Sequence, residues 1–405
     1  MVLAALNNLN INNCIKRYKA YMQLQHHPYS SLPSLPSRTV SLFLYISCLM
    51  AAIAQIDSRP KLTSVKALAE RPGLSSIPSL YTFPRHPNEE VFSDTKESIP
   101  ILDFSLLTST DPHERSKAIQ ELAKACQDWG FFMVTNHGVP ESMMKGITAA
   151  CREFFELTEE EKAEFEGKHV LDPIRYGTSV NASIDKVLCW RDYLKVFQHP
   201  EFHSPNKPPS FREISLEYGK RVRKVARDIL RGISESLGLE ENYIEKALNL
   251  ENGFQLLTAN LYPPCPQPEL AMGFLAHSDH GLLTLLIENE IRGLQVHHNG
   301  KWVNIDPIPN SFLANIGDHV EILSNGKYQS VLHRAVVNTR DVRISIAMQH
   351  APAWDAVVSP ASKLVGDEGN LPAFRAMEYK EYLELNQSSV LDRKSCLERV
   401  RNRVI

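Results

Sequence analysis

Three polar residues in apolar surroundings place the strongest constraint on the fold of this chain. His277 and Asp279 lie two positions apart in FLAHSDHGLLTLLI, and His333 follows 56 positions after His277, in SVLHRAVV. Two imidazoles and one carboxylate suit ferrous iron with coordination positions left open. Because alternate residues of a β-strand point to one face, His277 and Asp279 can share an ion. His333 must come from another strand, which predicts a β-barrel or jelly roll.

A second pair of residues predicts a carboxylate site. Arg343 lies ten positions after His333, and Ser345 follows at the spacing that puts both on one strand face. A guanidinium fork matches a carboxylate bidentately, and a lysine cannot reproduce that geometry. We therefore expect Arg343 and Ser345 to bind a carboxylate near the metal.

The composition excludes several classes of partner. The chain has 405 residues, 43% of them hydrophobic, and this is enough for a sizeable core. The formal net charge of −3, without long runs of one sign, gives no electrostatic footprint for nucleic acid or an acidic membrane. The seven cysteines are scattered and odd in number, which predicts reduced thiols in a cytoplasmic protein.

The N-terminal segment differs from the rest of the chain. Its first 56 residues contain no acidic residue, and its apolar run, residues 41–54, is shorter than the roughly 20 residues of a membrane span. Ala52-Ile53-Ala54 resembles a secretory cleavage site, but the leader before it is too long, and an organelle transit peptide is the other alternative. We interpret residues 1–63 as a disordered extension or as sequence before a start at Met50, and 64–98 as an irregular arm.

Periodicity predicts an α+β chain in which an N-terminal helical region packs on a β-rich half and a C-terminal helix follows. The β-rich half is the β-barrel or jelly roll (double-stranded β-helix) expected from the spacing of the three polar residues. In the first half we expect strands at 99–104 and 129–134, helices beginning at Pro112 and Pro140, a capping box at Thr158 and Glu161, irregular chain over 167–210, and a long helix ending at Gly238. In the second half we expect strands from Phe254, turns at Asn299-Gly300 and Asn325-Gly326, and a closing helix over 379–397.

Several ordered motifs make the chain resemble the plant iron and 2-oxoglutarate dependent dioxygenases from Ile99 to Leu397. They are WGFFMVTNHG, NLYPPCPQPEL, HSDHGLLTLL, GLQV, NIGDHVEILSNGKYQSVLHRAV and RIS. The segment Trp190-Arg191-Asp192-Tyr193 is most similar to the branch of downy-mildew-resistance-type oxygenases and flavone or flavanone oxidases.

This resemblance implies roles for individual residues. Iron ligands fall on His277, Asp279 and His333, and the 2-oxoglutarate clamp falls on Arg343 with Ser345. Tyr262 matches a tyrosine that hydrogen-bonds the 2-oxoglutarate carboxylate, and Asn260 lies beside it on the same strand face. Relatives that act on flavonoids place a phenylalanine four positions after the serine, and here that residue is Gln349.

The resemblance also implies a domain plan and an activity. Residues 99–250 would form the N-terminal helical region, 253–354 the jelly-roll domain and 355–405 a helical tail. We expect a monomer that uses Fe(II), dioxygen and 2-oxoglutarate, with ascorbate as reductant, to hydroxylate, desaturate or demethylate a small plant metabolite, releasing succinate and CO2. The alternatives are an iron oxidase of this fold that does not use 2-oxoglutarate, and an inactive jelly roll that binds small molecules.

Other conspicuous residues receive structural roles. We assign no metal role to four further histidines: His280, His297, His298 and His350. Four aromatic residues are expected in the core: Trp129, Phe131, Phe132 and Trp302. For Phe274 and Leu275, lining of the substrate pocket and simple packing both remain open.

Overall fold

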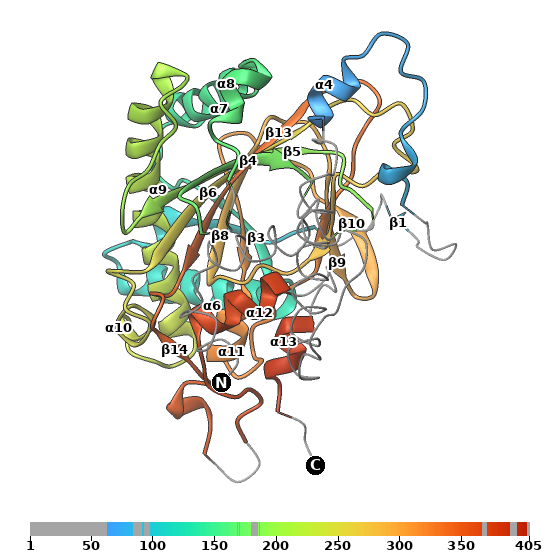
Figure 1. Cartoon of the computed structure of the whole chain (residues 1–405). Coiled ribbons are helices and arrows are strands. Elements are labelled where there is room, and N and C mark those ends of the chain that lie inside the picture. Colours follow the sequence, from blue (N-terminus) through green and yellow to red (C-terminus); the bar gives the residue numbers. More distant parts are fainter. Residues whose placement is uncertain are drawn as a thin grey trace, which may run out of the picture. The chain divides into compact units, whose positions relative to one another are not determined.

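Two β-sheets form the core of the protein in the computed structural model, which describes residues 63–83, 91–92, 98–167, 169, 171–179, 185, 187–366, 371–388 and 395–402. Among these residues, the large sheet has eight strands in the order β2-β3-β11-β8-β13-β6-β5-β4 (Figure 1). The small sheet has five, in the order β1-β10-β9-β12-β7, and β14 pairs with β15.

The strands are β1 (Val91–Phe92), β2 (Ile101–Asp103), β3 (Phe131–Thr135), β4 (Ile174–Thr178), β5 (Asp192–His199), β6 (Phe254–Tyr262), β7 (Phe274–His277), β8 (Leu283–Glu288), β9 (Leu294–His298), β10 (Lys301–Asn304), β11 (Phe312–Ile316), β12 (His333–Ala335), β13 (Arg343–Ala351), β14 (Val357–Val358) and β15 (Met377–Glu378). The α-helices are α4 (Val65–Ala69), α5 (Phe104–Leu107), α6 (Pro112–Asp128), α7 (Glu141–Glu156), α8 (Glu159–Ala163), α9 (Pro209–Ser236), α10 (Tyr243–Ala247), α11 (Asp318–Leu323), α12 (Tyr379–Ser388) and α13 (Ser395–Val400). Two 3-10 helices are η1 (Ser79–Tyr81) and η2 (Ser362–Leu364).

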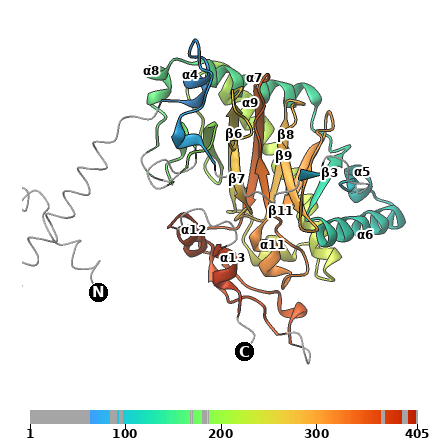
Figure 2. The ribbon, with the colours of Figure 1, turned by 90° about the vertical axis from the view of Figure 1, so that its right-hand side faces the viewer.

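The large sheet has one apolar face, which packs on helices. Alternate residues of β5, β6, β8 and β13 belong to one buried cluster with α6, α7 and α9; examples are Leu194, Leu257, Leu285 and Ile346. Figure 1 shows α9 and α6 alongside this sheet, and the turned view of Figure 2 places α11, α12 and α13 together at one end of the strands. The helices thus hold one face of the sheet rigid, and the opposite face is left for the site.

The expected jelly-roll fold is confirmed, and so are several local predictions. Asp111 caps α6 with Pro112 at its first turn, and Thr158 with Glu161 forms the capping box of α8. The Asn299-Gly300 turn joins β9 to β10, with both residues at positive φ. The C-terminal prediction is confirmed in part, since α12 and α13 take up the segment expected to close the chain.

The prediction that residues 167–210 are irregular is wrong, because β4 and β5 lie there and extend the large sheet at one edge. The N-terminal region therefore contributes four strands as well as helices. In β5 the buried residues Leu194 and Val196 alternate with Tyr193, Lys195 and Phe197. The alternation is hard to recognise in the sequence because the polar residues Asp192 and Gln198 lie on the buried face, while the aromatic residues Tyr193 and Phe197 lie on the other face.

The arm expected to be irregular over 64–98 contains α4, η1 and β1, and the extension proposed over 1–63 lies outside the described residues except for residue 63. The Asp192 carboxylate, which is fully buried, fixes α4 to β5. It accepts hydrogen bonds from the backbone N–H groups of Val65 (2.9 Å) and Lys66 (2.8 Å), and from the Thr178 hydroxyl (2.5 Å). None of the described helices is long and apolar enough to cross a bilayer.

Asp192→Ala should lower the free energy of unfolding by about 2–4 kcal/mol, because two backbone donors of α4 lose their buried acceptor. Urea unfolding followed by circular dichroism measures this change. Asp306→Ala is the control, since Asp306 pairs with Arg292 at the exposed surface and should cost less than about 1 kcal/mol. Equal costs for the two variants would contradict an anchoring role for Asp192.

Candidate active site

Three potential metal ligands meet where β7 pairs with β12. The antiparallel register sets His333 directly opposite His277. Asp279 Oδ1 lies 3.8 Å from His277 Nε2 and 3.9 Å from His333 Nε2, and the three ligand atoms lie within 4.8 Å of one another. Within the described ranges, no other group of three His, Cys, Asp or Glu residues converges in this way.

The expectation that one strand carries both His277 and Asp279 is wrong, because β7 ends at His277 and Asp279 lies in the following loop. The backbone N–H of Asp318 donates to the Asp279 carbonyl at 2.8 Å. A Cβ on Gly317 would lie 2.2 Å from the Gly281 carbonyl oxygen, so only glycine allows the two loops to approach this closely. Asp279 is therefore positioned by the loop before α11 and not by strand alternation.

Hydrogen bonds leave one atom of each residue free to bind a metal. Nδ1 of His277 lies 2.8 Å from the Leu275 carbonyl, and Nδ1 of His333 lies 3.2 Å from the Val331 carbonyl. Carbonyls only accept, so each Nδ1 carries the proton and each Nε2 presents its lone pair. Asp279 Oδ2 accepts from Thr284 (2.5 Å) and Asn315 (2.8 Å), which leaves Oδ1 free.

The electrostatics favour the forms that bind a metal. Burial lowers the pKa of His277, with a further decrease from His333, so this imidazole is neutral. Burial alone would raise the pKa of Asp279, but the two histidines and the hydrogen bonds from Asn315 and Thr284 outweigh it, so the net pKa is lowered. Two imidazoles that turn Nε2 towards one carboxylate oxygen form a donor set that fits Fe(II).

A buried arginine lies on the inner face of the large sheet. Arg343 on β13 is paired in register with Tyr262 on β6, and Ser345 with Asn260. Arg343 donates from Nε (3.0 Å) and Nη2 to Glu288 Oε2, while its buried Nη1 has no hydrogen-bond partner. Burial lowers the pKa of Arg343, but the charge of Glu288 outweighs this and the net pKa is raised. The guanidinium is thus charged and retains an unused donor.

Arg191 is a site residue that sequence reasoning did not identify as functional. It is fully buried and donates from Nη1 to Asn260 Oδ1 (2.6 Å), while Asn260 Nδ2 donates to the Ser345 hydroxyl (3.3 Å). Its guanidinium lies 3.6 Å from the centre of the Phe274 ring, and that ring lies 4.1 Å from the His277 ring. Arg191 therefore connects the residues around Arg343 to the histidine on β7.

The remaining conspicuous residues lie around this site or away from it. Phe131 is buried as expected, but it also contacts the His333 ring edge to face at 5.3 Å. Phe132 belongs to the core beneath the helices, Trp129 stacks on His298, and Trp302 packs edge to face on His297.

The other histidines and the residues considered for the substrate pocket have different surroundings. His280 contacts the Tyr379 hydroxyl, and His350 contacts Gln255. Leu275 is buried, while Phe274 and Gln349 keep accessible surface.

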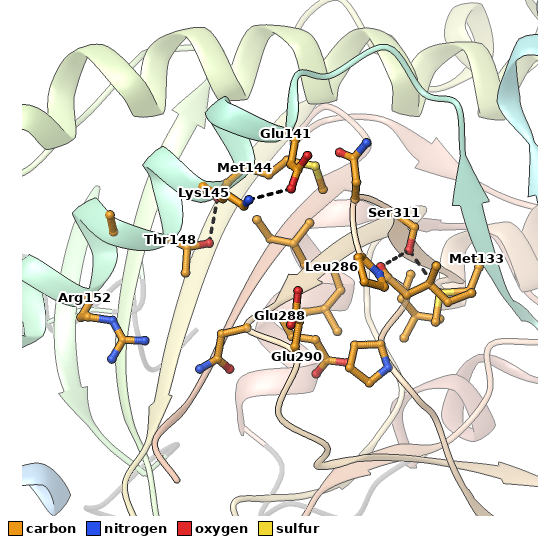
Figure 3. A pocket seen from close by; sticks show the side chains of 18 residues that line it. Met133, Glu141, Met144, Lys145, Thr148, Arg152, Leu286, Glu288, Glu290 and Ser311 are labelled. Atoms are coloured by element: carbon orange, nitrogen blue, oxygen red, sulfur yellow. Dashed lines mark hydrogen bonds and ion pairs between the residues drawn. The ribbon is translucent and has the colours of Figure 1, made fainter.

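A separate depression of about 360 Å³ lies between α7 and the ends of β8 and β11. Figure 3 shows Lys145 and Glu141 of α7 on one side of this depression and Leu286, Glu288 and Glu290 across from them. It reaches Glu288, the partner of Arg343, but none of the three potential ligands lines it.

A jelly roll with two histidines and one carboxylate converging between its sheets defines a non-haem iron oxygenase. Comparisons with known proteins agree. Residues 253–352 match the 2OG-Fe(II) oxygenase superfamily, and residues 99–214 match the N-terminal region of the non-haem dioxygenase in morphine synthesis.

Two curated plant proteins and one solved structure are similar over most of their length. The chain is 48% identical to 2-oxoglutarate-dependent dioxygenase 19 of Oryza sativa subsp. japonica, covering 75% of this chain and 90% of that protein. It is 39% identical to DOWNY MILDEW RESISTANCE 6 of Arabidopsis thaliana, covering 84% and 94%. The crystal structure of JOX2 in complex with 2OG, Fe and JA matches with a TM-score of 0.76 and 32% identity, covering 85% and 99%.

The chain therefore belongs to the 2OG-Fe(II) oxygenase superfamily, and the resemblance seen in the sequence is confirmed. It is a 2-oxoglutarate-dependent dioxygenase, an oxidoreductase that couples oxidative decarboxylation of 2-oxoglutarate to oxidation of a small plant metabolite.

Glu288→Gln should lower the free energy of unfolding by about 2 kcal/mol, because the buried Arg343 guanidinium loses the charge that balances it. Chemical denaturation without added ligand is the measurement. Glu217→Gln, which removes an exposed partner of Lys220, should change stability by less than about 1 kcal/mol. A Glu288→Gln protein as stable as the wild type would show that the pair contributes nothing.

Proposed function

We propose that His277, Asp279 and His333 hold the iron of this dioxygenase. The observation that carries the proposal is the convergence of two Nε2 atoms and one Oδ1 atom, each left free by hydrogen bonds at the other end of its side chain. Thr284 and Asn315 fix the carboxylate of Asp279, and Phe131 and Phe274 cover the histidine rings with apolar surface.

The same proposal assigns the distal carboxylate of 2-oxoglutarate to Arg343, with Ser345 and Tyr262, and places Asn260 beside them. The unused Nη1 donor of Arg343 supports this role, because a buried donor without a partner costs about 1–3 kcal/mol and a carboxylate would satisfy it. Arg191 holds Asn260, and Asn260 in turn orients the Ser345 hydroxyl. These residues bind and orient the co-substrate without transferring a proton.

When bound, iron with 2-oxoglutarate activates dioxygen for oxidation of a substrate C–H bond, while 2-oxoglutarate becomes succinate and CO2. The cofactor carries this chemistry, and the protein contributes orientation and exclusion of water. Ascorbate is the proposed reductant that keeps iron ferrous. The outcome is hydroxylation, desaturation or demethylation of the substrate.

We further propose that the protein works as a cytoplasmic monomer on a small molecule and does not bind nucleic acid or membranes. The nearly even charge balance supports the absence of nucleic-acid binding. The five described cysteines are buried free thiols, which supports a reducing compartment.

His333→Ala should weaken binding of Fe(II) by more than about 100-fold and abolish 2-oxoglutarate turnover. The loss of a ligand should cost more than the loss of a residue that only hydrogen-bonds to a ligand. Anaerobic metal titration, with succinate measured after exposure to air, tests both effects. His113→Ala, an exposed histidine on α6, is the control and should retain full metal affinity. Unchanged metal affinity in His333→Ala would remove this residue from the ligand set.

Arg343→Lys should raise the KM for 2-oxoglutarate by about 10- to 100-fold, because a lysine cannot both pair with Glu288 and supply the donor that Nη1 of Arg343 offers. Steady-state succinate formation at varied 2-oxoglutarate is the measurement, and Arg340→Lys, at an exposed position, is the matched control. If the KM stays at the wild-type value, the carboxylate is held elsewhere.

A further inference from the structure

A row of polar side chains crosses the inner face of the large sheet, away from Arg343. The strand register sets Arg175 of β4 opposite Lys195 of β5, and Lys195 opposite Thr258 of β6. Thr258 lies two residues before Asn260, so it points to the same face as the proposed 2-oxoglutarate residues. We call Arg175, Lys195 and Thr258 the Lys195 row.

The basic groups of the Lys195 row form no ion pair with another residue in the described part of the chain. Burial lowers the pKa of Arg175, and the charges of Tyr193 and Asp172 oppose this shift without an ion pair. Like charges directly opposite each other destabilise a sheet. The Arg175 Nε and the Thr258 hydroxyl are buried without a hydrogen-bond partner, and the nearby Arg191 also has an unused Nη2. Such groups cost free energy unless an anion pairs with them.

The Lys195 row borders accessible surface on the inner face of the large sheet. Along β5 and β13, the inward residues Tyr193, Lys195, Ala347 and Gln349 keep accessible area while their outward neighbours are buried. Ala347 of β13 is paired in register with Thr258 of β6. Burial lowers the pKa of Lys195, Arg175 and Arg191 lower it further, and the charge of Asp279 opposes this shift.

We propose that the organic substrate carries a carboxylate, and that Lys195 binds this carboxylate with Arg175 and Thr258. The inference rests on the proposed function, because it concerns the substrate of the same site. The subsite differs from that of 2-oxoglutarate: Thr258 and Tyr262 are four residues apart on β6, about 13 Å at 3.3 Å per residue. In addition, the carboxylate of Glu288 already pairs with the charge of Arg343. Within the described residues, no carboxylate forms an ion pair with the Lys195 row.

The test compares carboxylates with their uncharged amides. Protein loaded anaerobically with Fe(II) and saturating 2-oxoglutarate is titrated calorimetrically with benzoate and benzamide, 3-phenylpropanoate and its amide, and indole-3-carboxylate and its amide. At least one acid should bind about tenfold or more tightly than its amide, the equivalent of one charge-assisted hydrogen bond. Equal affinities in every pair would overturn the proposal.

Two variants of Lys195 and one control assign the preference to this residue. Lys195→Met should reduce the preference for the acid to less than about twofold, while Lys195→Arg, which restores the charge, should retain it. Lys117→Met, on the exposed face of α6, should behave as the wild type. Persistence of the preference in Lys195→Met would contradict the assignment.

Binding of iron and 2-oxoglutarate is measured on the same samples. A wild-type protein that binds neither, yet prefers acids over amides, would refute the proposed function and leave the carboxylate subsite standing. A Lys195→Met protein that loses 2-oxoglutarate as strongly as it loses the acid would show that the row serves the co-substrate, and this would overturn the inference.

Discussion

The site depends on the pairing of β7 with β12, which sets His333 opposite His277. A shift of this register by one residue would turn one histidine to the other face of the sheet, and the two Nε2 atoms would no longer converge. The jelly roll makes the pairing possible because it brings strands 56 residues apart into one sheet. The loop contact between Gly317 and Gly281 then adds Asp279 from outside the strand.

The two faces of the large sheet have different roles: one packs against helices and stabilises the fold, and the other carries the site. Its outward residues pack on α6, α7 and α9 and form the main core, while its inward face carries the polar residues of the site beside apolar ones such as Phe131 and Leu313. Buried polar groups are tolerated only when they are paired, and most of them here are paired: Arg343 with Glu288, Arg191 with Asn260, and Asp279 with Thr284 and Asn315. Three of the buried donors left without partners, on Arg343, Arg175 and Thr258, lie where we place bound carboxylates.

The sequence was sufficient to predict the fold class, the convergence of the three potential ligands and the shared face of Arg343 and Ser345. The shared face of Arg343 and Ser345 and the turn at Asn299-Gly300 follow local rules of spacing, whereas Asp279 reaches the two histidines through the loop contact at Gly317 and not through strand alternation. It was not sufficient for Glu288, Arg191 or Lys195, because their roles come from cross-strand partners that lie 55, 69 and 63 residues away. Polar Asp192 and Gln198 on the buried face of β5, with aromatic residues on its other face, also made this strand difficult to recognise.

The central claim is that one site holds both iron and 2-oxoglutarate. Calorimetric titration with 2-oxoglutarate, performed anaerobically on metal-free protein and on protein loaded with Fe(II), tests this claim most directly. The account predicts one iron and one 2-oxoglutarate per chain, with 2-oxoglutarate bound at least about tenfold more tightly when iron is present. Equal affinity with and without iron would contradict a shared site, because the residues around Arg343 would then bind their ligand independently of His277, Asp279 and His333.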